Sequence, residues 1–239
     1  MSRPWVLVSG ASSGFGAASA IQLAKEGWNL LLTSRREARL EAVATTCQDL
    51  GAEVHVAAWD MRERQDTLEG VKELMSRAGI APGQGGTALQ GLVNNAGLAV
   101  GKGPFDEGLD DDWDRMIDTN VKGLLFLARA CVPFMTVGSR MVNMGSIAGK
   151  QVYPGGNVYC ASKHAVDALS QAMRIDLVDR GIGVSQICPG AAETEFSNVR
   201  FKGDQAAADA VYRGFDPLVA QDIAEAVSFV LSRPPHVCI

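Results

Sequence analysis

Short apolar runs alternate with longer amphipathic stretches along this chain. The runs are apolar throughout rather than at every second position, which is typical of strands that helices cover on both faces of a parallel sheet. The pattern predicts six strands, at residues 6–8, 30–32, 54–58, 92–93, 141–144 and 184–187, and helices at 17–26, 36–50, 112–135 and 158–180.

The alternation of strands and helices predicts one doubly wound Rossmann-type α/β domain with a parallel sheet and helices on both faces. No internal repeat or linker divides residues 1–239, so we expect a single domain. The glycine-rich segment 78–90 is expected to be a surface loop. Residues 197–216 follow the last strand, near the ligand edge of such sheets, and are interpreted as either a mobile lid or a plain surface loop.

Charge and cysteine usage exclude several classes of function. The net charge is −5 and there is no large basic block, so we expect no nucleic-acid groove. The longest apolar stretch, 123–135, is broken by Arg129 and Pro133 and is too short to cross a membrane. Residues 1–4 lead directly into an apolar run, which predicts no signal peptide. The five scattered cysteines have no metal-ligand spacing, so we expect reduced thiols in a cytoplasmic protein without a metal.

Glycines cluster at the turn after the first predicted strand, where residues 9–16 read Ser-Gly-Ala-Ser-Ser-Gly-Phe-Gly. Such glycines let the backbone turn tightly and approach a ligand, and the next helix offers unpaired N–H groups to a pyrophosphate. Glycine-rich turns are common, but this one lies between a strand and a helix, which favours a dinucleotide site. The predicted contacts are Gly10, Ser12, Ser13, Gly14, Phe15 and Gly16.

The second strand ends in Ser34, Arg35 and Arg36, where an NAD site usually has an acidic residue for the ribose 2′-hydroxyl. Two guanidinium groups instead suit a 2′-phosphate, so we expect NADP. The alternative is that both arginines are the solvated start of a helix. Cations at that position oppose the helix dipole, which weakens the alternative.

Polar and small residues also follow the third and fourth strands, at the ligand edge of the sheet. Asp60 with Met61 could contact an adenine, and Asn94, Ala96 and Gly97 could lie along a ribose. Taken singly, each of these segments could be an ordinary turn.

Tyr159 and Lys163 lie four residues apart, on one face of a predicted helix. A nearby ammonium favours a phenolate, and a phenol shifted toward neutrality can exchange a proton with an alcohol. Ser146, after the fifth strand, could hold a substrate oxygen. Asn120 could distort its helix and bind a water linked to Lys163. The alternatives are a surface Tyr/Lys pair and an incidental asparagine.

Together these motifs resemble the short-chain dehydrogenase/reductase family over nearly the whole chain. The resemblance assigns the catalytic tetrad to Asn120, Ser146, Tyr159 and Lys163. It also implies cofactor contacts from Asp60, Met61, Tyr159 and Lys163, with Lys163 holding the nicotinamide ribose, and from the segment after the sixth strand. The residues of that segment that match the family motif are Pro189, Gly190 and Thr194.

Residues 94–99, 155–159 and 194–204 are more narrowly similar to the NADP-dependent 3-hydroxy acid dehydrogenases. That resemblance implies a homotetramer that oxidises serine, allo-threonine or 3-hydroxypropionate, or reduces malonic semialdehyde. Two departures are expected to matter. The segment between Gly190 and Thr194 is one residue shorter than in that group, and the chain stops at residue 239 where relatives continue into a last strand. The lid hinge or the tetramer contacts are therefore expected to differ, or the protein to be longer.

The expected reaction transfers a hydride between NADP(H) and a carbonyl or hydroxyl carbon of a small substrate. Residues 1–150 would mainly bind the cofactor, and 140–216 would carry the catalytic residues and the lid. Ser146 and Tyr159 would contact the substrate, and Arg200 would anchor its acid group, with Lys202 or Lys150 as other candidates. The alternatives are a reductase of neutral ketones, sugars or acyl thioesters and, on the same fold, a non-enzymatic NADP-binding protein.

Overall fold

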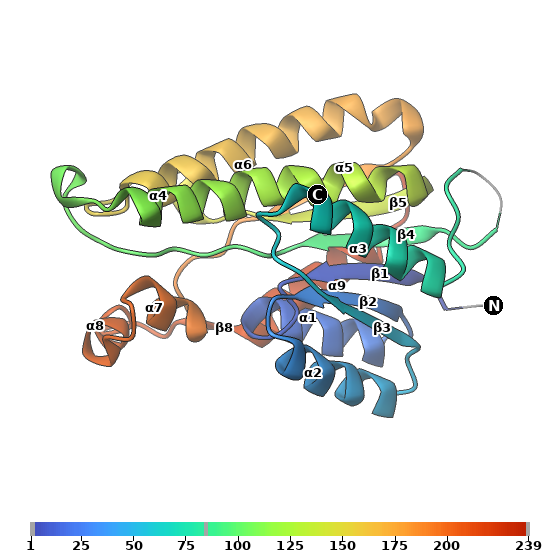
Figure 1. Cartoon of the computed structure of the whole chain (residues 1–239), viewed down its shortest axis with the longest axis horizontal. Helices are drawn as coiled ribbons and strands as arrows, with labels where there is room; N and C mark the ends of the chain where they lie inside the picture. The colour runs from blue at the N-terminus through green and yellow to red at the C-terminus, as the bar shows by residue number, and fades with distance from the viewer. Residues whose placement is uncertain (1–2, 84–85, 238–239) are drawn as a thin grey trace.

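Six parallel strands form the central sheet of the computed structural model, which describes residues 3–83 and 86–237 (Figure 1). Their order is β3-β2-β1-β4-β5-β6, so the direction in which the sheet grows reverses between β1 and β4. This order confirms the predicted Rossmann-type sheet. The strands are β1 (Trp5–Ser9), β2 (Asn29–Ser34), β3 (Val54–Ala58), β4 (Leu89–Asn94), β5 (Met135–Met144) and β6 (Gly183–Ile187).

Helices cover both faces of the sheet (Figure 1). Successive residues of the central strand β1 enter opposite layers: Leu7 packs into one apolar cluster, while Val6 and Val8 pack into the other. All three are fully buried, which explains why the strands have no alternating polar positions. One layer contains α1 (Gly14–Lys25), α2 (Glu37–Asp49) and α9 (Ala220–Leu231), and the other contains α3 (Arg64–Arg77), α4 (Asp110–Ile117), α5 (Leu124–Cys131) and α6 (Asn157–Asp176).

The helix predicted over 112–135 is interrupted. A π-helical turn, Asp118–Gly123, separates α4 from α5, and a 3-10 turn, Val132–Phe134, follows α5. Pro133 cannot donate a backbone hydrogen bond, so the α-helix ends before it, and Met135 already belongs to β5. The predicted loop 78–90 likewise overlaps the start of β4, and α3 and α9 have no counterpart in the prediction.

Residues 194–217, which we call the β7–β8 segment, leave the sheet after β6 (Figure 1). The expected loop contains two short helices, α7 (Glu195–Arg200) and α8 (Gln205–Ala210). Strands β7 (Ala192–Glu193) and β8 (Leu218–Val219) pair in parallel and join the two ends of the segment. The β7–β8 segment is therefore folded into helices, and the pairing of β7 with β8 holds its two ends together.

Three of the cysteines, Cys47, Cys131 and Cys160, are buried free thiols, and Cys188 is partly exposed. Burial raises the pKa of the Cys47 thiol to about 11, so it stays protonated at neutral pH. Cys238 lies outside the described residues. Over residues 3–83 and 86–237, no helix has the length and apolarity that a membrane span requires, and no cluster of side chains could hold a metal ion.

Candidate active site

A cavity of about 270 Å³ lies at the carboxyl ends of the strands, on both sides of the reversal in strand order. Such a crevice is where doubly wound sheets bind their ligands. Most of the predicted site residues line it: Gly10, Ser12, Ser13, Gly14, Phe15, Ser34, Arg35, Arg36, Asp60, Met61, Ala96, Gly97, Tyr159, Lys163 and Thr194.

The glycine turn between β1 and α1 is built by close backbone packing. Gly10 has φ +66° and Gly14 has φ +52°, which a residue with a side chain rarely adopts. The sequence predicts that Gly16 lets the backbone approach a ligand, but in the structure this glycine has a different role. It does not line the cavity, and a Cβ there would lie 2.7 Å from Asn95 Nδ2 and even closer to the Gly10 carbonyl. Gly16 therefore lets α1 pack against the loop after β4.

That loop is held by a residue that the sequence prediction omitted. Asn95 Nδ2 donates to the Ser9 carbonyl over 2.8 Å, while the backbone N–H groups of Asn95 and Ala96 donate to Ser9 Oγ. The predicted cofactor residue Asn94 lies outside the cavity: its amide is buried and donates to the Leu124 carbonyl over 2.9 Å. Asn94 thus ties β4 to α5, because alternate strand residues point to opposite faces.

The first turn of α1 suits a phosphate. Ser13 occupies the N-cap position without a side-chain cap bond, and no acidic residue lies in the first turn. Unpaired N–H groups and the positive end of the helix dipole therefore face the cavity between Gly14 and Thr194. An anion there would complete the hydrogen bonding of the helix start.

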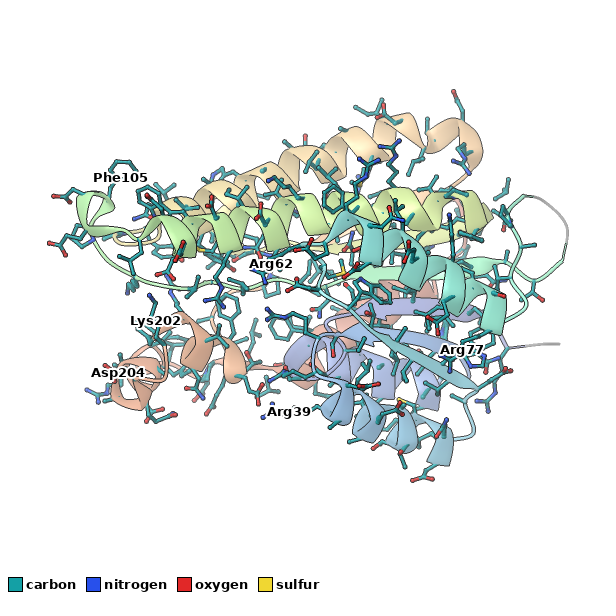
Figure 2. All side chains as sticks on the ribbon, in the orientation of Figure 1. Arg39, Arg62, Arg77, Phe105, Lys202 and Asp204 are labelled. Carbon is teal, nitrogen blue, oxygen red and sulfur yellow. The ribbon has the colours of Figure 1, made fainter. Side chains whose placement is uncertain are left out.

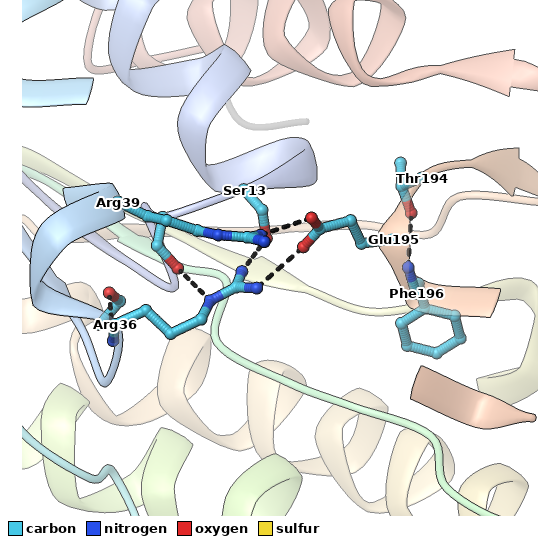
Figure 3. A network of polar contacts seen from close by, with 8 residues as sticks. Ser13, Arg36, Arg39, Thr194, Glu195 and Phe196 are labelled. Carbon is cyan, nitrogen blue, oxygen red and sulfur yellow. Dashed lines mark hydrogen bonds and ion pairs between the residues drawn. The ribbon is translucent and has the colours of Figure 1, made fainter. Parts of the chain in front are cut away.

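The predicted 2′-phosphate arginines lie at the same cavity, beside the end of β2. Arg36 donates through Nη1 to Glu195 over 2.9 Å, and Arg39 donates to the same carboxylate over 2.5 Å (Figure 3). Arg36 also donates through Nε to the Ser12 hydroxyl and through Nη2 to the Ser13 hydroxyl. Arg36 is therefore engaged at the cavity, which contradicts the alternative of a merely solvated helix start.

Beside the arginines, the end of β3 carries an ionised carboxylate. Asp60 accepts hydrogen bonds from the guanidinium and backbone N–H of Arg62, and Arg35 lies 3.9 Å away. Burial alone would raise the pKa of Asp60, but Arg62 and Arg35 lower it below the usual value. Two cavity residues absent from the prediction, Trp59 and Thr119, have buried polar atoms with no partner among the described residues. An acceptor atom of a ligand could satisfy the Trp59 indole N–H, and the Thr119 hydroxyl could pair with either a donor or an acceptor.

Tyr159 and Lys163 line the other end of the cavity from α6, and both are buried. Lys163 Nζ donates to the Met144 carbonyl over 2.8 Å and lies 6.0 Å from the centre of the Tyr159 ring. Burial raises the pKa of Tyr159 to about 12, although a hydrogen bond with Ser146 lowers it. Burial also lowers the pKa of Lys163 to about 8. In the protein alone, burial therefore shifts the pKa of this phenol in the opposite direction to the one that the sequence predicts.

Ser146 lies where the prediction needs it, although it is not among the residues that line the cavity. It begins the 3-10 turn Ile147–Gly149, and its Oγ accepts from the Ala148 N–H over 3.1 Å. Its hydrogen bond to Tyr159 means that both hydroxyls can reach one substrate oxygen. The pair is thus adjacent despite lying on different elements.

Asn120 sits in the π-helical turn, as the predicted distortion of its helix requires. Its amide exchanges two hydrogen bonds of 2.8 Å with the backbone of Leu98 and donates a third to Ser162. A Cβ on Gly97 would lie 3.2 Å from Asn120 Oδ1 and 3.6 Å from Lys163 Nζ. Gly97 therefore leaves room for a small polar group between Asn120 and Lys163.

Of the three candidate acid anchors, only Arg200 adjoins Tyr159. Its guanidinium lies 5.8 Å from the Tyr159 ring and donates to the hydroxyl of Tyr153 over 2.7 Å. Its buried Nε has no partner in the described part of the chain. Lys150 pairs instead with Asp167. Lys202, which lies on the β7–β8 segment (Figure 2), pairs with Asp112 on α4. Both lysines are thus paired with carboxylates of the protein, and Tyr153 is a neighbour of Arg200 that the prediction missed.

The loop after β6 completes the site. Pro189 accepts at its carbonyl from the Ile147 N–H over 3.0 Å, which holds the loop against the turn that begins at Ser146. Pro189 and Gly190 do not line the cavity, in contrast to the predicted cofactor contact. Thr194 does line it, and caps α7 by accepting from the Phe196 N–H. Phe196, also a cavity residue, packs on the Tyr159 ring at 5.6 Å.

Residues 4–205 match the family model described as short chain dehydrogenase. A sulfoacetaldehyde reductase of Chromohalobacter salexigens is 43% identical over 97% of this chain and 89% of its own length. The NADP-dependent 3-hydroxy acid dehydrogenase YdfG of Salmonella typhi is 41% identical over 98% of this chain and 91% of its own. The solved closed form of serine dehydrogenase complexed with NADP+ has a TM-score of 0.85 at 37% identity, covering 98% of this chain and 92% of that one.

Proposed function

Because the chain belongs to the short chain dehydrogenase family, we propose that it is an NADP(H)-dependent oxidoreductase of small 3-hydroxy acids. Such substrates include serine, allo-threonine and 3-hydroxypropionate, with malonic semialdehyde in the reducing direction. The observation that carries the proposal is the position of Arg200 beside Tyr159, which puts a cation next to the proposed proton donor. A substrate with its hydroxyl at Tyr159 would then have its acid group near Arg200.

The cavity residues fit NADP(H) better than NAD(H). The first turn of α1 would take the pyrophosphate, and Arg35 and Arg36 would take the 2′-phosphate. Ser34 stands where NAD-binding sites have a carboxylate, so this position itself would not repel the phosphate. When bound, the nicotinamide supplies or accepts the hydride.

Side chains of the protein would hold the substrate oxygen and transfer the proton. Ser146 would hold the carbonyl oxygen by hydrogen bonding, and Tyr159 would protonate it as negative charge develops. A raised pKa keeps Tyr159 protonated at neutral pH, which suits reduction. Lys163 and Asn120, separated by the space at Gly97, would return a proton to Tyr159 through a small polar group.

A carboxylate and a sulfonate both carry negatively charged oxygens, two of which a guanidinium can bind with two hydrogen bonds. Arg200, with Tyr153 as a second donor, therefore also suits a short sulfonate. The similarity to a sulfoacetaldehyde reductase makes 2-hydroxyethanesulfonate the second candidate substrate. We further propose a cytoplasmic homotetramer.

The test is reduction of NADP by a panel of alcohols, with the Tyr159→Phe variant as control. The panel contains serine, allo-threonine, 3-hydroxypropionate, 2-hydroxyethanesulfonate and a neutral alcohol of similar size. We expect at least one acid to exceed the neutral alcohol in kcat/KM. A preference for neutral alcohols would assign another carbonyl class, and NADPH binding without turnover of any substrate would indicate a non-enzymatic protein.

A further inference from the structure

The ion-pair network at the start of α7 joins two parts of the cavity that are far apart in sequence. Glu195 belongs to the β7–β8 segment, whereas Arg36 and Arg39 belong to the loop and first turn of α2 (Figure 3). The three side chains are about half exposed. The network therefore crosses the cavity wall beside the Ser12 and Ser13 hydroxyls.

We propose that Glu195 is a specificity-determining residue that competes with the 2′-phosphate of NADP(H) for Arg36 and Arg39. This inference rests on the proposed function, because it assumes a cofactor that carries this phosphate. Glu195, Ser12 and Ser13 each accept from a different nitrogen of the Arg36 guanidinium, and Glu195 is the charged partner of the three. A phosphate that binds Arg36 and Arg39 from the side of Glu195 displaces its carboxylate. A carboxylate and a phosphate offer an arginine the same kind of charged acceptor.

The negative charge of Glu195, like its position, opposes binding of a phosphate to Arg36. Arg36 and Arg39 lower the pKa of Glu195 below its ordinary value, so the carboxylate is ionised at neutral pH. A phosphate bound to Arg36 would then lie within a few ångströms of a like charge, which exposure to solvent screens only in part. Glu195 thus lowers affinity for a phosphorylated ribose and leaves an unphosphorylated ribose unaffected.

The competition also couples cofactor binding to the β7–β8 segment. Glu195 is the first residue of α7, and Thr194 and Phe196 on either side of it line the cavity. When the phosphate displaces the carboxylate, the network no longer ties α7 to α2. NADP(H) would therefore release the start of α7, whereas NAD(H) would leave it attached.

The test compares binding by the wild type, Glu195→Gln and Glu193→Gln, using titration calorimetry with NADPH, NADH, adenosine 2′,5′-bisphosphate and 5′-AMP. Glutamine keeps the shape of Glu195 and removes its charge. Glu193 is an exposed carboxylate on β7 that makes no ion pair within the described part of the chain, so its variant is the matched control.

We expect Glu195→Gln to tighten binding of NADPH and the 2′,5′-bisphosphate about three- to tenfold, the effect of losing one or two exposed ion pairs. NADH and 5′-AMP should bind as to the wild type, and Glu193→Gln should leave all four affinities within about twofold. Hydrogen exchange over 194–200 should be faster in wild type with the 2′,5′-bisphosphate than with 5′-AMP.

Unchanged or weakened NADPH binding by Glu195→Gln would overturn the inference, because weakening would mean that Glu195 holds Arg36 in place for the phosphate. Equal tightening for NADPH and NADH would also overturn it, since the effect would not depend on the 2′-phosphate. If the wild type binds NADPH no better than NADH, the proposed cofactor itself is wrong. The wild-type measurement therefore separates the two failures.

Discussion

The two ends of the cavity, one at the turn between β1 and α1 and the other around Tyr159, differ in whether backbone or side chains form them. At the end proposed for the nucleotide, the backbone makes the part that would hold the pyrophosphate, through the Gly10 and Gly14 turns and the first turn of α1. At the substrate end side chains make it, and they come from α6, from the loop after β5 and from α7. The nucleotide end therefore depends on room for the backbone, while the substrate end depends on the functional groups of Tyr159 and Arg200.

The difference predicts opposite kinds of sensitivity. Adding a single carbon should damage the nucleotide end, because its backbone segments are already in contact. Removing a single polar atom should damage the substrate end, because its chemistry rests on individual hydroxyl and guanidinium groups.

The largest effect is expected from Tyr159→Phe, which removes only the hydroxyl. Loss of a general acid lowers turnover by about 10²- to 10⁴-fold. NADPH affinity should stay within about threefold in titration calorimetry, because the nucleotide end is untouched. A variant that keeps a tenth of wild-type kcat would show that another group donates the proton.

The next largest is expected from Gly16→Ala. A Cβ at Gly16 would lie 2.7 Å from Asn95 Nδ2, so α1 or the loop after β4 must move. Overpacking of this kind costs about 1–3 kcal/mol of unfolding free energy, measured by denaturant unfolding, and should weaken NADPH binding. Gly103→Ala is the matched control, because nothing lies within 4 Å of its added Cβ. Equal stability of the two variants would show that the close packing is dispensable.

Arg200→Gln tests whether the guanidinium of Arg200 binds the acid group of the substrate. Charged hydrogen bonds contribute about 1.5–3 kcal/mol, so kcat/KM for an acid substrate should fall about 10- to 100-fold. A neutral alcohol should be affected much less. Lys150→Gln is the control, because Lys150 pairs with Asp167 on the surface. Equal losses for acidic and neutral substrates would remove Arg200 as the anchor.

The same contrast explains how far the sequence could be interpreted. Glycine spacing, strand runs and the Tyr159/Lys163 spacing are local properties of the chain, and they correctly predict the sheet, the turn after β1 and the shared face of α6. The partners of Arg36 and Arg200 are not local. Glu195 is 159 residues from Arg36, and Tyr153 is 47 residues from Arg200. Only the folded chain brings them together.

The two residues that the sequence wrongly places against the cavity, Asn94 and Gly16, also depend on contacts that are not local. Asn94 and Gly16 belong to motifs that line the cavity, yet they face away from it because neighbouring strand residues point to opposite sides and because α1 packs closely. The pKa of Tyr159 was also beyond sequence reasoning. The spacing to Lys163 indicates an attractive charge, but the extent of burial, which determines the net direction, is a property of the whole fold.

The remaining expected effect is a pH dependence that differs between the two directions of reaction. Alcohol oxidation needs Tyr159 to accept a proton, and burial raises its pKa to about 12, so the phenolate fraction grows as pH rises. With saturating NADP, the oxidation rate should increase by up to about tenfold per pH unit between pH 7 and 9. Reduction needs the protonated phenol, so its rate should change little over that range.

Ser146→Ala provides the control for this pH profile. The hydrogen bond from Ser146 lowers the pKa of Tyr159, so its loss should shift the oxidation profile to higher pH. Kinetics in both directions, over pH 6–10 with the wild type and Ser146→Ala, measure the shift. An oxidation rate independent of pH would mean that Tyr159 is not the group that takes the proton. The substrate end would then depend on a different side chain from the one its geometry indicates.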